Sequence, residues 1–132
     1  MEHKFENSKD LKYTKDHEWI RVEGNKAVIG ITDAAQSMLG DVVFVELPEI
    51  GAEYGAHDPI ASIESVKAVS EVFIPISGKI VEVNSLLESS PDLINKSAFA
   101  DGWIVVVEIS DPGELDSLLS VEEYLQVLTE GE

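Results

Sequence analysis

Short runs of apolar and β-branched residues recur along the chain, and clusters of turn-forming residues separate them. Runs of this length and composition are typical of β-strands. Glu23-Gly24-Asn25 lies between the first two runs and predicts a tight turn there. The predicted strands are residues 20–22, 26–31, 42–47, 60–63, 69–74, 80–83 and 103–109.

Helix signals stand after the first strands and towards the end of the chain. Asp33 is placed as an N-cap, Gln36 follows three residues later and Gly40 can stop a helix, so the pattern predicts a helix over 34–39. Ser90-Pro91 predicts one helical turn that ends near Asn95. Asp111-Pro112, with Glu114, predicts the start of a helix. Ser120 and Glu123 predict a capping box before Tyr124, Leu125 and Leu128.

The order of these elements indicates a mainly β fold. Short strands at regular spacing, with helices gathered at the chain end, favour a small β-sandwich or flattened barrel with peripheral helices. Residues 1–10 are expected to form a loose N-terminal leader, and residues 11–132 a single domain. Residues 40–45 and 78–83 share the pattern Gly-x-aliphatic-Val-x-Val, which fits either approximate symmetry between two halves of a sheet structure or a chance match.

The charge balance narrows the choice of partners. The 132 residues include 9 basic and 26 acidic side chains, which give a formal net charge of −17. A surface this acidic repels phosphate backbones, so nucleic acid is not expected as a partner, whereas basic patches on other proteins are. The same charge would also keep an abundant protein in solution without any further role.

Two absences from the sequence exclude further classes of chemistry. The chain has no cysteine, which removes disulfides, thiolate metal sites and cysteine nucleophiles. It has no run of 18 apolar residues, so no membrane span is expected. The start of the sequence lacks an apolar or Arg-rich targeting segment, which favours a cytoplasmic protein of a prokaryote, although a trimmed mature chain would look the same.

The residue types in 63–72 are arranged symmetrically about the bond between Lys67 and Ala68, so that Val66 corresponds to Val69. This is the pairing of a β-hairpin with a two-residue loop. Such a loop usually requires positive φ at both positions and favours Asn-Gly, so Lys67-Ala68 would be an unusual tip. The other predicted pairs are Ser65 with Ser70, Glu64 with Glu71 and Ile63 with Val72.

A turn without turn-forming residues points to a function for Lys67, because local preferences are overridden at such places. A lysine at a hairpin tip presents a flexible stem and an amine to solvent. The nearest charges in sequence, Glu64 and Glu71, favour the protonated amine, so Lys67 is interpreted as a handle for modification and not as a nucleophilic catalyst. The alternative is an ordinary solvated turn lysine.

The flanks of this hairpin resemble a known family. Residues 64–68, Glu-Ser-Val-Lys-Ala, with Val69-Ser70-Glu71 and Pro75-Ile76-Ser77-Gly78 after them, are similar to the lipoylation hairpin of glycine cleavage H proteins. Further blocks match in order over about residues 11–127: His17-Glu18-Trp19, Gly30-Ile31-Thr32-Asp33, Ala35-Gln36, Leu39-Gly40-Asp41, Val45-Glu46-Leu47-Pro48, Gly51, Asn84, Pro91, Asn95 and Gly102-Trp103.

Two positions depart from the family pattern. Ala98-Phe99 stands where the family usually has Pro-Tyr, and Lys79 stands where it usually has Asp or Glu. The first departure puts a local loop shape and one hydroxyl hydrogen bond in doubt. Neither departure touches the hairpin around Lys67, so the resemblance of that segment is unaffected.

The resemblance implies a lipoyl/biotinyl-type fold, a barrel-sandwich hybrid, and a carrier that is not itself an enzyme. Lipoate would be attached to Lys67 by a lipoyl or octanoyl transferase or a lipoate ligase. The arm would accept an aminomethyl group from a pyridoxal-phosphate glycine decarboxylase, present it to a tetrahydrofolate-dependent aminomethyltransferase and be reoxidised by dihydrolipoyl dehydrogenase. The recognition hairpin would comprise Glu64, Ser65, Val66 and Ala68 around the lysine.

A loaded arm of this kind would carry a cationic amine that is labile to water, so a groove with carboxylates could shelter it. Glu18 and Glu71, with Asp16, are the acids expected to line such a groove; each is otherwise an ordinary surface acid. His17, beside Trp19, is expected to be a structural hydrogen-bonding residue, and three scattered histidines predict no metal site.

Other interpretations of the sequence remain open. A biotin carrier or the lipoyl domain of an oxoacid dehydrogenase would share the lysine hairpin, but such domains are usually shorter. A relay protein that passes octanoyl or lipoyl groups to other lipoate-dependent enzymes would use the same Lys67, and a plain interaction domain would use no cofactor. An enzyme has no support in the sequence, which lacks both a Gly-rich phosphate loop and Gly-x-Ser-x-Gly.

Overall fold

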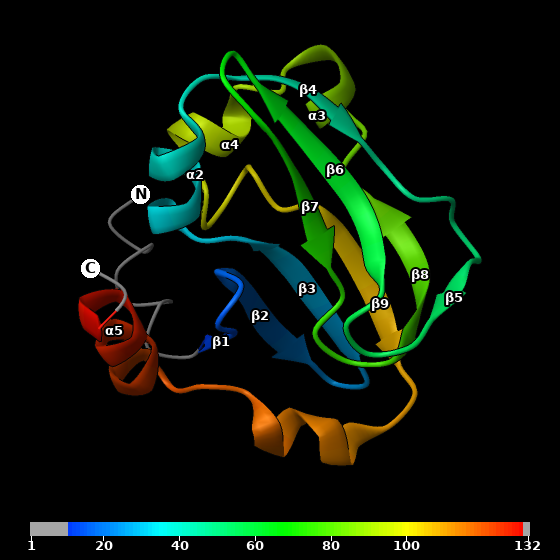
Figure 1. Ribbon diagram of the computed structural model, residues 1–132. Helices are drawn as coiled ribbons and strands as arrows, with labels where there is room; N and C mark the ends of the chain where they lie inside the picture. Colours follow the sequence, from blue (N-terminus) through cyan, green and yellow to red (C-terminus); the bar gives the residue numbers. More distant parts are fainter. Residues whose placement is uncertain (1–10, 131–132) are drawn as a thin grey trace.

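The computed structural model describes residues 11–130, which form two antiparallel sheets (Figure 1). Within these residues the larger sheet has the strand order β1 (Lys12–Tyr13), β2 (Glu18–Glu23), β3 (Lys26–Ile31), β9 (Val105–Ile109), β8 (Gly78–Val83) and β5 (Glu53–Tyr54). The smaller sheet has the order β4 (Val42–Glu46), β6 (Pro59–Ser65) and β7 (Val69–Phe73). The predicted mainly β fold, a flattened barrel-sandwich, is confirmed.

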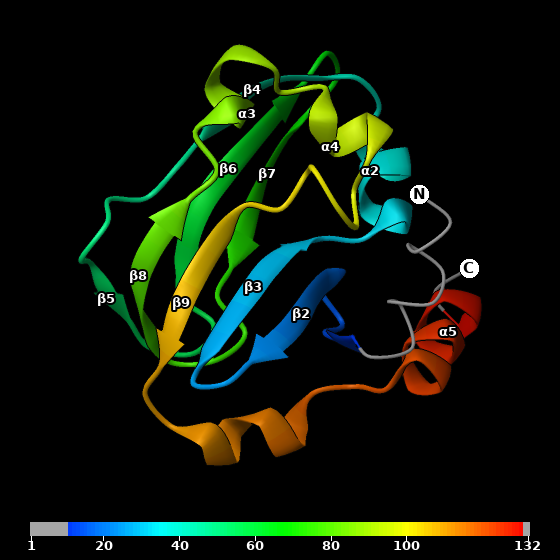
Figure 2. The same cartoon turned by 180° about the vertical axis from the view of Figure 1, so that it is seen from behind.

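The two sheets enclose a core rich in isoleucine. Alternate residues along each strand point inward, and β-branched side chains suit such a pleated surface. Ile29 on β3, Ile63 on β6 and Ile80 on β8 are each at most 1% exposed and belong to one apolar cluster. Figure 2 shows β8, β9, β3 and β2 side by side, with β6 and β7 behind them, so the core lies between the two sheets.

Short helices cover the ends of the sheets. α2 (Asp33–Leu39), α3 (Leu86–Ser89) and α4 (Leu93–Lys96) lie near the tip of the β6–β7 hairpin, at the top of Figure 1. A 3-10 helix, η2 (Pro112–Ser117), leads to α5 (Val121–Glu130), which contacts β1. With its ten residues α5 is the longest helix in the described part of the chain, and a helix that crosses a bilayer needs about twice that length.

Most predicted elements are present, with shifted boundaries. The structure adds the two-residue strands β1 and β5 and helix α3, because elements this short contain too few residues to show a hydrophobic period. β9 begins at Val105, and Trp103 lies in the segment before it. The leader predicted at residues 1–10 lies outside the described residues, and the division into a leader and one domain stays a prediction.

The first helix is capped one residue earlier than predicted. Thr32 is the N-cap, because its hydroxyl accepts the N–H of Ala35 at 3.2 Å, and Asp33 is the first residue of the helix. Asp33 accepts a hydrogen bond from the side chain of Gln36 at 3.0 Å instead. Gly40 ends the helix at a φ of 80°, a conformation that favours glycine, as the sequence predicts.

The capping box predicted near the chain end is confirmed. Ser120 Oγ accepts the N–H of Glu123 at 3.2 Å, and the Glu123 carboxylate accepts the N–H of Ser120 at 2.9 Å. Asp111 caps the preceding helix by accepting the N–H of Gly113 at 3.1 Å. The predicted start at Asp111-Pro112 is therefore correct, but it opens a 3-10 helix that is separate from α5.

The two segments of the weak internal repeat form β4 and β8, which belong to different sheets. Each strand has a register shift at the same place in the repeat, between Val42 and Phe44 in β4 and between Ile80 and Glu82 in β8. A bulge adds one residue to a strand and increases its local twist. The matching bulges support approximate symmetry between the two segments over a chance match.

A smaller apolar cluster lies on the outer side of the large sheet around Trp19, which is fully buried. The Trp19 indole N–H donates to the backbone oxygen of Ala98 at 2.9 Å, and the Phe99 ring lies 6.3 Å from the Trp19 ring, centroid to centroid. Ala98-Phe99 therefore still supplies an acceptor and an aromatic ring to the tryptophan. Gly30 pairs with Trp19 across β2 and β3 and leaves room for the indole.

Gly30→Ala should destabilise the protein, because a Cβ at residue 30 would lie 2.7 Å from atoms of the buried Trp19 ring. The expected loss in free energy of unfolding is about 1–3 kcal/mol, the usual cost of overpacking a core. Gly55→Ala is the control, since its Cβ would meet only the Asp58 carboxylate at 3.6 Å. Urea unfolding measures both variants, and equal stabilities would contradict the close approach of residue 30 to the indole.

Candidate functional site

The predicted register of the β6–β7 hairpin is wrong, because each paired residue of β6 has a partner two positions earlier on β7 than predicted. The mirror pattern set Glu64 opposite Glu71, but Glu64 pairs with Val69 in the structure. The two-residue tip is therefore Val66-Lys67, and Lys67 still lies at the tip, exposed to solvent. The predicted and the observed register differ by two residues and therefore direct the same side chains to the core, so the hydrophobic pattern does not choose between them.

The Ser65 hydroxyl explains how the tip closes without a turn-forming residue. Its oxygen accepts the N–H groups of Lys67 at 3.3 Å and Ala68 at 3.0 Å, and the hydroxyl donates to the Ala68 carbonyl at 3.2 Å. The tip residues do not have the positive φ that a two-residue loop usually requires, since only His17 and His57 have positive φ among the described non-glycine residues. A side-chain acceptor of this kind lets ordinary residues occupy a turn.

A second set of contacts fixes the tip to the start of β4. The N–H of Val66 donates to the Asp41 carbonyl at 3.0 Å. Asn95 on α4 holds the same segment from its other side: its amide donates to the Gly40 carbonyl at 2.8 Å and accepts the N–H of Val42 at 2.8 Å. Sequence reasoning gave Asn95 no role at the site, although its place in the family blocks was a signal that could have found it.

The Lys67 stem runs along the end of α2. A Cβ built on Gly40 would lie 3.4 Å from Lys67 Cε, so glycine at this position leaves room for the stem. Among the described residues no carboxylate forms an ion pair with the Lys67 amine. The amine is therefore accessible for modification.

A cavity of about 200 Å³ lies beside this hairpin and is called the hairpin groove below. Asp16, Glu18 and Glu71, the three acids expected to share a groove, all line it. Glu64 is exposed and does not line this groove, although the strand register places Glu64 and Glu71 on the same face of the small sheet. The other lining residues, mostly apolar, are His17, Ile31, Ala35, Met38, Leu39, Ile63, Ser70 and Val72.

Glu18 is the buried acid of the hairpin groove, with only 2% of its surface exposed. The Thr14 hydroxyl donates to Glu18 Oε1 at 2.9 Å, and the N–H of Phe73 donates to Oε2 at 2.9 Å. Among the described residues no cation lies within ion-pair distance of this carboxylate. A buried carboxylate without a positive partner is costly, so it is a candidate for binding a cationic group.

Burial raises the pKa of Glu18 from 4.5 to about 7, because the charged carboxylate loses hydration. The nearby Asp16 charge also raises this pKa, whereas the hydrogen bonds from Phe73 and Thr14 favour the anion and lower it. Glu18 therefore changes its charge near neutral pH. A cation brought into the groove would favour the ionised form.

Tyr124 on α5 ties the two walls of the hairpin groove together. Its hydroxyl lies 2.7 Å from Nδ1 of His17 and 2.7 Å from the hydroxyl of Thr32, the cap of α2. Its ring stacks on Tyr13 of β1, with ring centroids 4.8 Å apart. His17 is thus a structural hydrogen-bonding residue, as the sequence predicts, and its partner comes from the far end of the chain.

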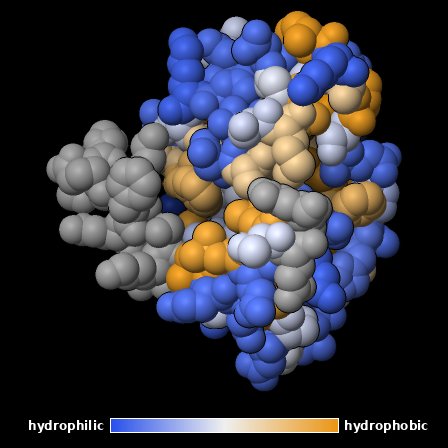
Figure 3. Space-filling view, turned by 60° about the vertical axis from the view of Figure 1, so that its left-hand side comes forward, coloured by the Kyte–Doolittle hydropathy of each residue, from blue (hydrophilic) through white to orange (hydrophobic). Residues whose placement is uncertain are grey.

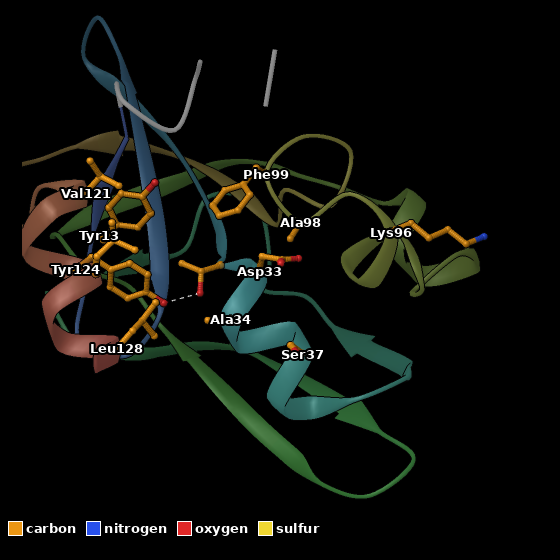
Figure 4. A pocket seen from close by; sticks show the side chains of 12 residues that line it. Tyr13, Asp33, Ala34, Ser37, Lys96, Ala98, Phe99, Val121, Tyr124 and Leu128 are labelled. Atoms are coloured by element: carbon orange, nitrogen blue, oxygen red, sulfur yellow. Dashed lines mark hydrogen bonds between the residues drawn. The ribbon is translucent and has the colours of Figure 1, made fainter. Parts of the chain in front are cut away.

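A larger, mostly apolar cavity of about 530 Å³ lies on the other side of this contact (Figure 4). It is bounded by α2, by α5 and by the loop around Phe99, and the Thr32–Tyr124 hydrogen bond stands at its wall. No residue of the β6–β7 hairpin lines it. Of these two cavities, the β6–β7 hairpin therefore contributes only to the hairpin groove.

The groups around Lys67 fit a covalently attached acyl arm. An exposed amine can form an amide, the apolar groove walls suit a hydrocarbon chain, and Glu18 suits a cation at the end of that chain. Within residues 11–130 no group of three or more His, Asp or Glu side chains is arranged to hold a metal ion.

Comparison with known proteins finds relatives over nearly the whole chain. The family model described as Glycine cleavage H-protein matches residues 11–131. A glycine cleavage system H protein of Geobacillus sp. (strain WCH70) is 55% identical over 123 residues, which make up 93% of this chain and 97% of that relative. One from Symbiobacterium thermophilum is 56% identical over 122 residues, 92% of this chain and 95% of the relative. The crystal structure of a glycine cleavage system H protein from Mycobacterium marinum is similar with a TM-score of 0.83 at 37% identity, over 94% of this chain and 98% of that one.

Glu18→Gln should change how stability depends on pH. The folded protein keeps a proton on Glu18 up to about pH 7, whereas the unfolded chain loses it near pH 4.5. The stabilisation is therefore complete below pH 4.5 and is lost as the pH rises through 7, by an amount of about 3 kcal/mol. The glutamine variant has no such loss.

Urea unfolding of both proteins at about pH 5 and about pH 8 measures this difference. Glu71→Gln is the matched control, because Glu71 lines the same groove but is exposed. If the stability difference between the original chain and Glu18→Gln is the same at both pH values, the raised pKa of Glu18 is wrong.

Proposed function

The chain belongs to the glycine cleavage H-protein family, and on this premise we propose that it carries lipoate as an amide on Lys67. The observation that carries the proposal is the hairpin tip, where Lys67 is exposed while Ser65 and Asp41 hold its backbone neighbours. An ordered tip presents one amine in one place, which favours its modification over that of other surface lysines.

Attachment requires a carboxyl group that a partner enzyme has activated, and we propose a lipoyl or octanoyl transferase or a lipoate ligase. The neutral Nζ of Lys67 forms the amide bond to the carbonyl carbon, the activating group leaves with its bonding electron pair, and Nζ loses a proton. In the recognition hairpin Ser65 acts by shaping the backbone, whereas the exposed Val66 and Glu64 can be contacted directly.

When bound, the lipoyl group supplies a disulfide that can accept an aminomethyl group, and this chain supplies position and shelter. Glu18 would hold the cationic amine of the loaded arm through a charge-assisted hydrogen bond. Asp16 and Glu71 line the same groove and would add negative potential. The apolar wall residues would limit the access of water to the labile amine.

We propose that the bond-making steps belong to partner enzymes and that the chain is a non-catalytic carrier. These partners are a pyridoxal-phosphate glycine decarboxylase, a tetrahydrofolate-dependent aminomethyltransferase and dihydrolipoyl dehydrogenase. A net charge of −17 suits docking on basic surfaces, at rates that fall as salt rises. Tethering raises the effective concentration of the arm at each docked enzyme. Location in the cytoplasm of a bacterium stays a prediction.

A relay that passes octanoyl or lipoyl groups to other enzymes would use Lys67 in the same way. Such acyl groups carry no cation, so a relay has no need of a buried carboxylate beside its arm. Glu18 is buried without a positive partner among the described residues, and this costs stability at neutral pH. Its burial therefore favours the aminomethyl carrier over the relay.

Lys67→Arg should fold normally and carry nothing. The substitution keeps the charge and an apolar stem at an exposed position, but guanidinium does not form the required amide. Incubation with lipoate–protein ligase, lipoate and ATP should add one lipoyl mass to the original chain and none to the variant. Lys79→Arg, on the larger sheet, is the control and should accept the lipoyl group normally.

Glycine-dependent carbon dioxide release in a reconstituted glycine cleavage system is the second readout for Lys67→Arg. The variant should lose at least about a hundredfold in rate, since the tethered arm is the only route for the aminomethyl group in the proposal. A fully active Lys67→Arg protein would refute the carrier role.

Glu18→Gln should shorten the lifetime of the loaded arm. Replacing the anion by an amide removes a charge-assisted hydrogen bond to the amine, so release of ammonia from the loaded protein should be about tenfold faster. The advantage of the original chain should be largest near pH 8 and should shrink in acid as Glu18 becomes protonated, at a pH below 7 because the cation in the groove favours the ionised form. Glu82→Gln, an exposed acid on β8, is the control; equal lifetimes for all three proteins would refute sheltering by Glu18.

A further inference from the structure

The cavity of about 530 Å³ between α2 and α5, called the apolar cavity below, has no role in the proposed function. α5 lines it with Val121, Tyr124, Leu125 and Leu128, which follow one another at the spacing of one helix face. Leu125 is 54% exposed, so the described residues cover this face only in part. Figure 3 views the side of the molecule that carries α2 and α5, where apolar side chains reach the surface among hydrophilic ones.

The charges at the wall of the apolar cavity are balanced and already paired within the chain. Lys96 forms an ion pair with Asp92 at 2.9 Å, and Asp33 accepts a hydrogen bond from the side chain of Gln36 at 3.0 Å. The hairpin groove differs, because three carboxylates line it and none of its described lining residues is lysine or arginine. A cation therefore fits the hairpin groove, whereas an uncharged apolar group fits the apolar cavity.

The apolar cavity lies within reach of an arm that starts at the hairpin tip. The Lys67 stem passes Gly40 at the end of α2, where a Cβ would lie 3.4 Å from Lys67 Cε. Ser37 lines the apolar cavity and stands three residues before Gly40, about 4.5 Å along the helix axis. α2 separates the two cavities, since residues 33, 34 and 37 line the apolar cavity and residues 35, 38 and 39 line the hairpin groove.

We propose that the apolar cavity is a second binding site for the lipoyl arm on Lys67 and takes the arm in its unloaded, oxidised form. The hairpin groove keeps its proposed role for the cationic loaded arm. The inference rests on the proposed function, because it concerns the same arm. Charge decides between the two sites, so loading moves the arm from one side of α2 to the other.

The chemistry of the cavity wall suits an uncharged arm that ends in a cyclic disulfide. Apolar carbon chains gain free energy when they leave water for walls of this kind. Sulfur makes favourable contacts with aromatic rings, and Tyr13, Phe99 and Tyr124 supply three rings to the wall (Figure 4). In the hairpin groove the same chain would remove water from carboxylates without donating a hydrogen bond to them, which is unfavourable.

Methyl NMR of the lipoylated protein, with labelled leucine and valine, locates the unloaded arm. Val121 and Leu128 report on the apolar cavity, whereas Leu39 and Val72 report on the hairpin groove. Between the apo chain and the oxidised lipoylated chain, the first pair of methyl signals should shift and the second pair should stay in place. Shifts of the groove pair alone, or of neither pair, would overturn the inference.

Reduction of the arm by dithiothreitol is the second test, because this reductant is small and uncharged and an arm inside a cavity is shielded from it. The chain has no cysteine, so trapping with iodoacetamide and weighing the protein counts only the two thiols of the arm. Ser37→Trp should obstruct the apolar cavity from an exposed position. Reduction should then be about fivefold faster, as for an arm that spends about four fifths of its time in the cavity of the original chain.

Ser117→Trp is the matched control, since it makes the same change at an exposed position on η2, and Ser117 lines neither cavity. Its arm should be reduced at the original rate. Leu125→Gln is an independent variant that makes the cavity wall polar and keeps a good helix former, so it should also speed reduction. Circular dichroism checks the fold of each protein.

Equal reduction rates in the original chain, Ser37→Trp and Leu125→Gln would overturn the inference, while lipoylation of Lys67 and the proposed function would stand. An equal increase in Ser117→Trp would overturn it too, because the effect would then not depend on the apolar cavity. Failure of the original chain to gain a lipoyl group on Lys67 would instead overturn the proposed function and the inference together.

Discussion

The hydrogen bonds of the Ser65 hydroxyl hold the hairpin tip, and the presentation of Lys67 depends on them. The oxygen accepts two backbone N–H groups that a turn of ordinary residues would leave without a nearby acceptor. The Asp41 carbonyl accepts the N–H of Val66, and Asn95 forms hydrogen bonds to the residues on either side of Asp41. Polar contacts among three separate parts of the chain thus give a fixed base to a side chain whose function requires freedom at its outer end.

Folding and the proposed binding role favour opposite protonation states of Glu18 in the hairpin groove. Folding favours a neutral Glu18, because burial removes its hydration and no cation lies beside it in the described structure. Carriage of a cationic amine favours the ionised form. Hydrogen bonds from Thr14 and Phe73 moderate the conflict by stabilising the anion, so the pKa stays near neutrality. Stability lost at this position is a cost that a binding role would explain.

Contacts between the two ends of the described chain shape the groove. The hydroxyl of Tyr124 joins His17, next to Glu18, to Thr32, which caps α2. Both groove walls therefore depend on α5, although that helix lies outside the two sheets (Figure 1). The helices at the chain end are more than a cover for the sandwich, since one of their hydroxyl groups sets the distance between the acidic segment and α2.

Local rules of the sequence determined the strands, the Ser120 capping box and the lysine at a hairpin tip, because each depends on residues within a few positions. The mirror around Lys67 placed the tip one residue too late, because the Ser65 hydroxyl and the Asp41 carbonyl accept the N–H groups of a tip at Val66-Lys67, and the Asp41 contact is not visible in the sequence. The roles of Asn95 and Tyr124 and the burial of Glu18 were decided only by the tertiary structure. Their partners lie far away in sequence, and hydration is lost only when distant segments close over a group.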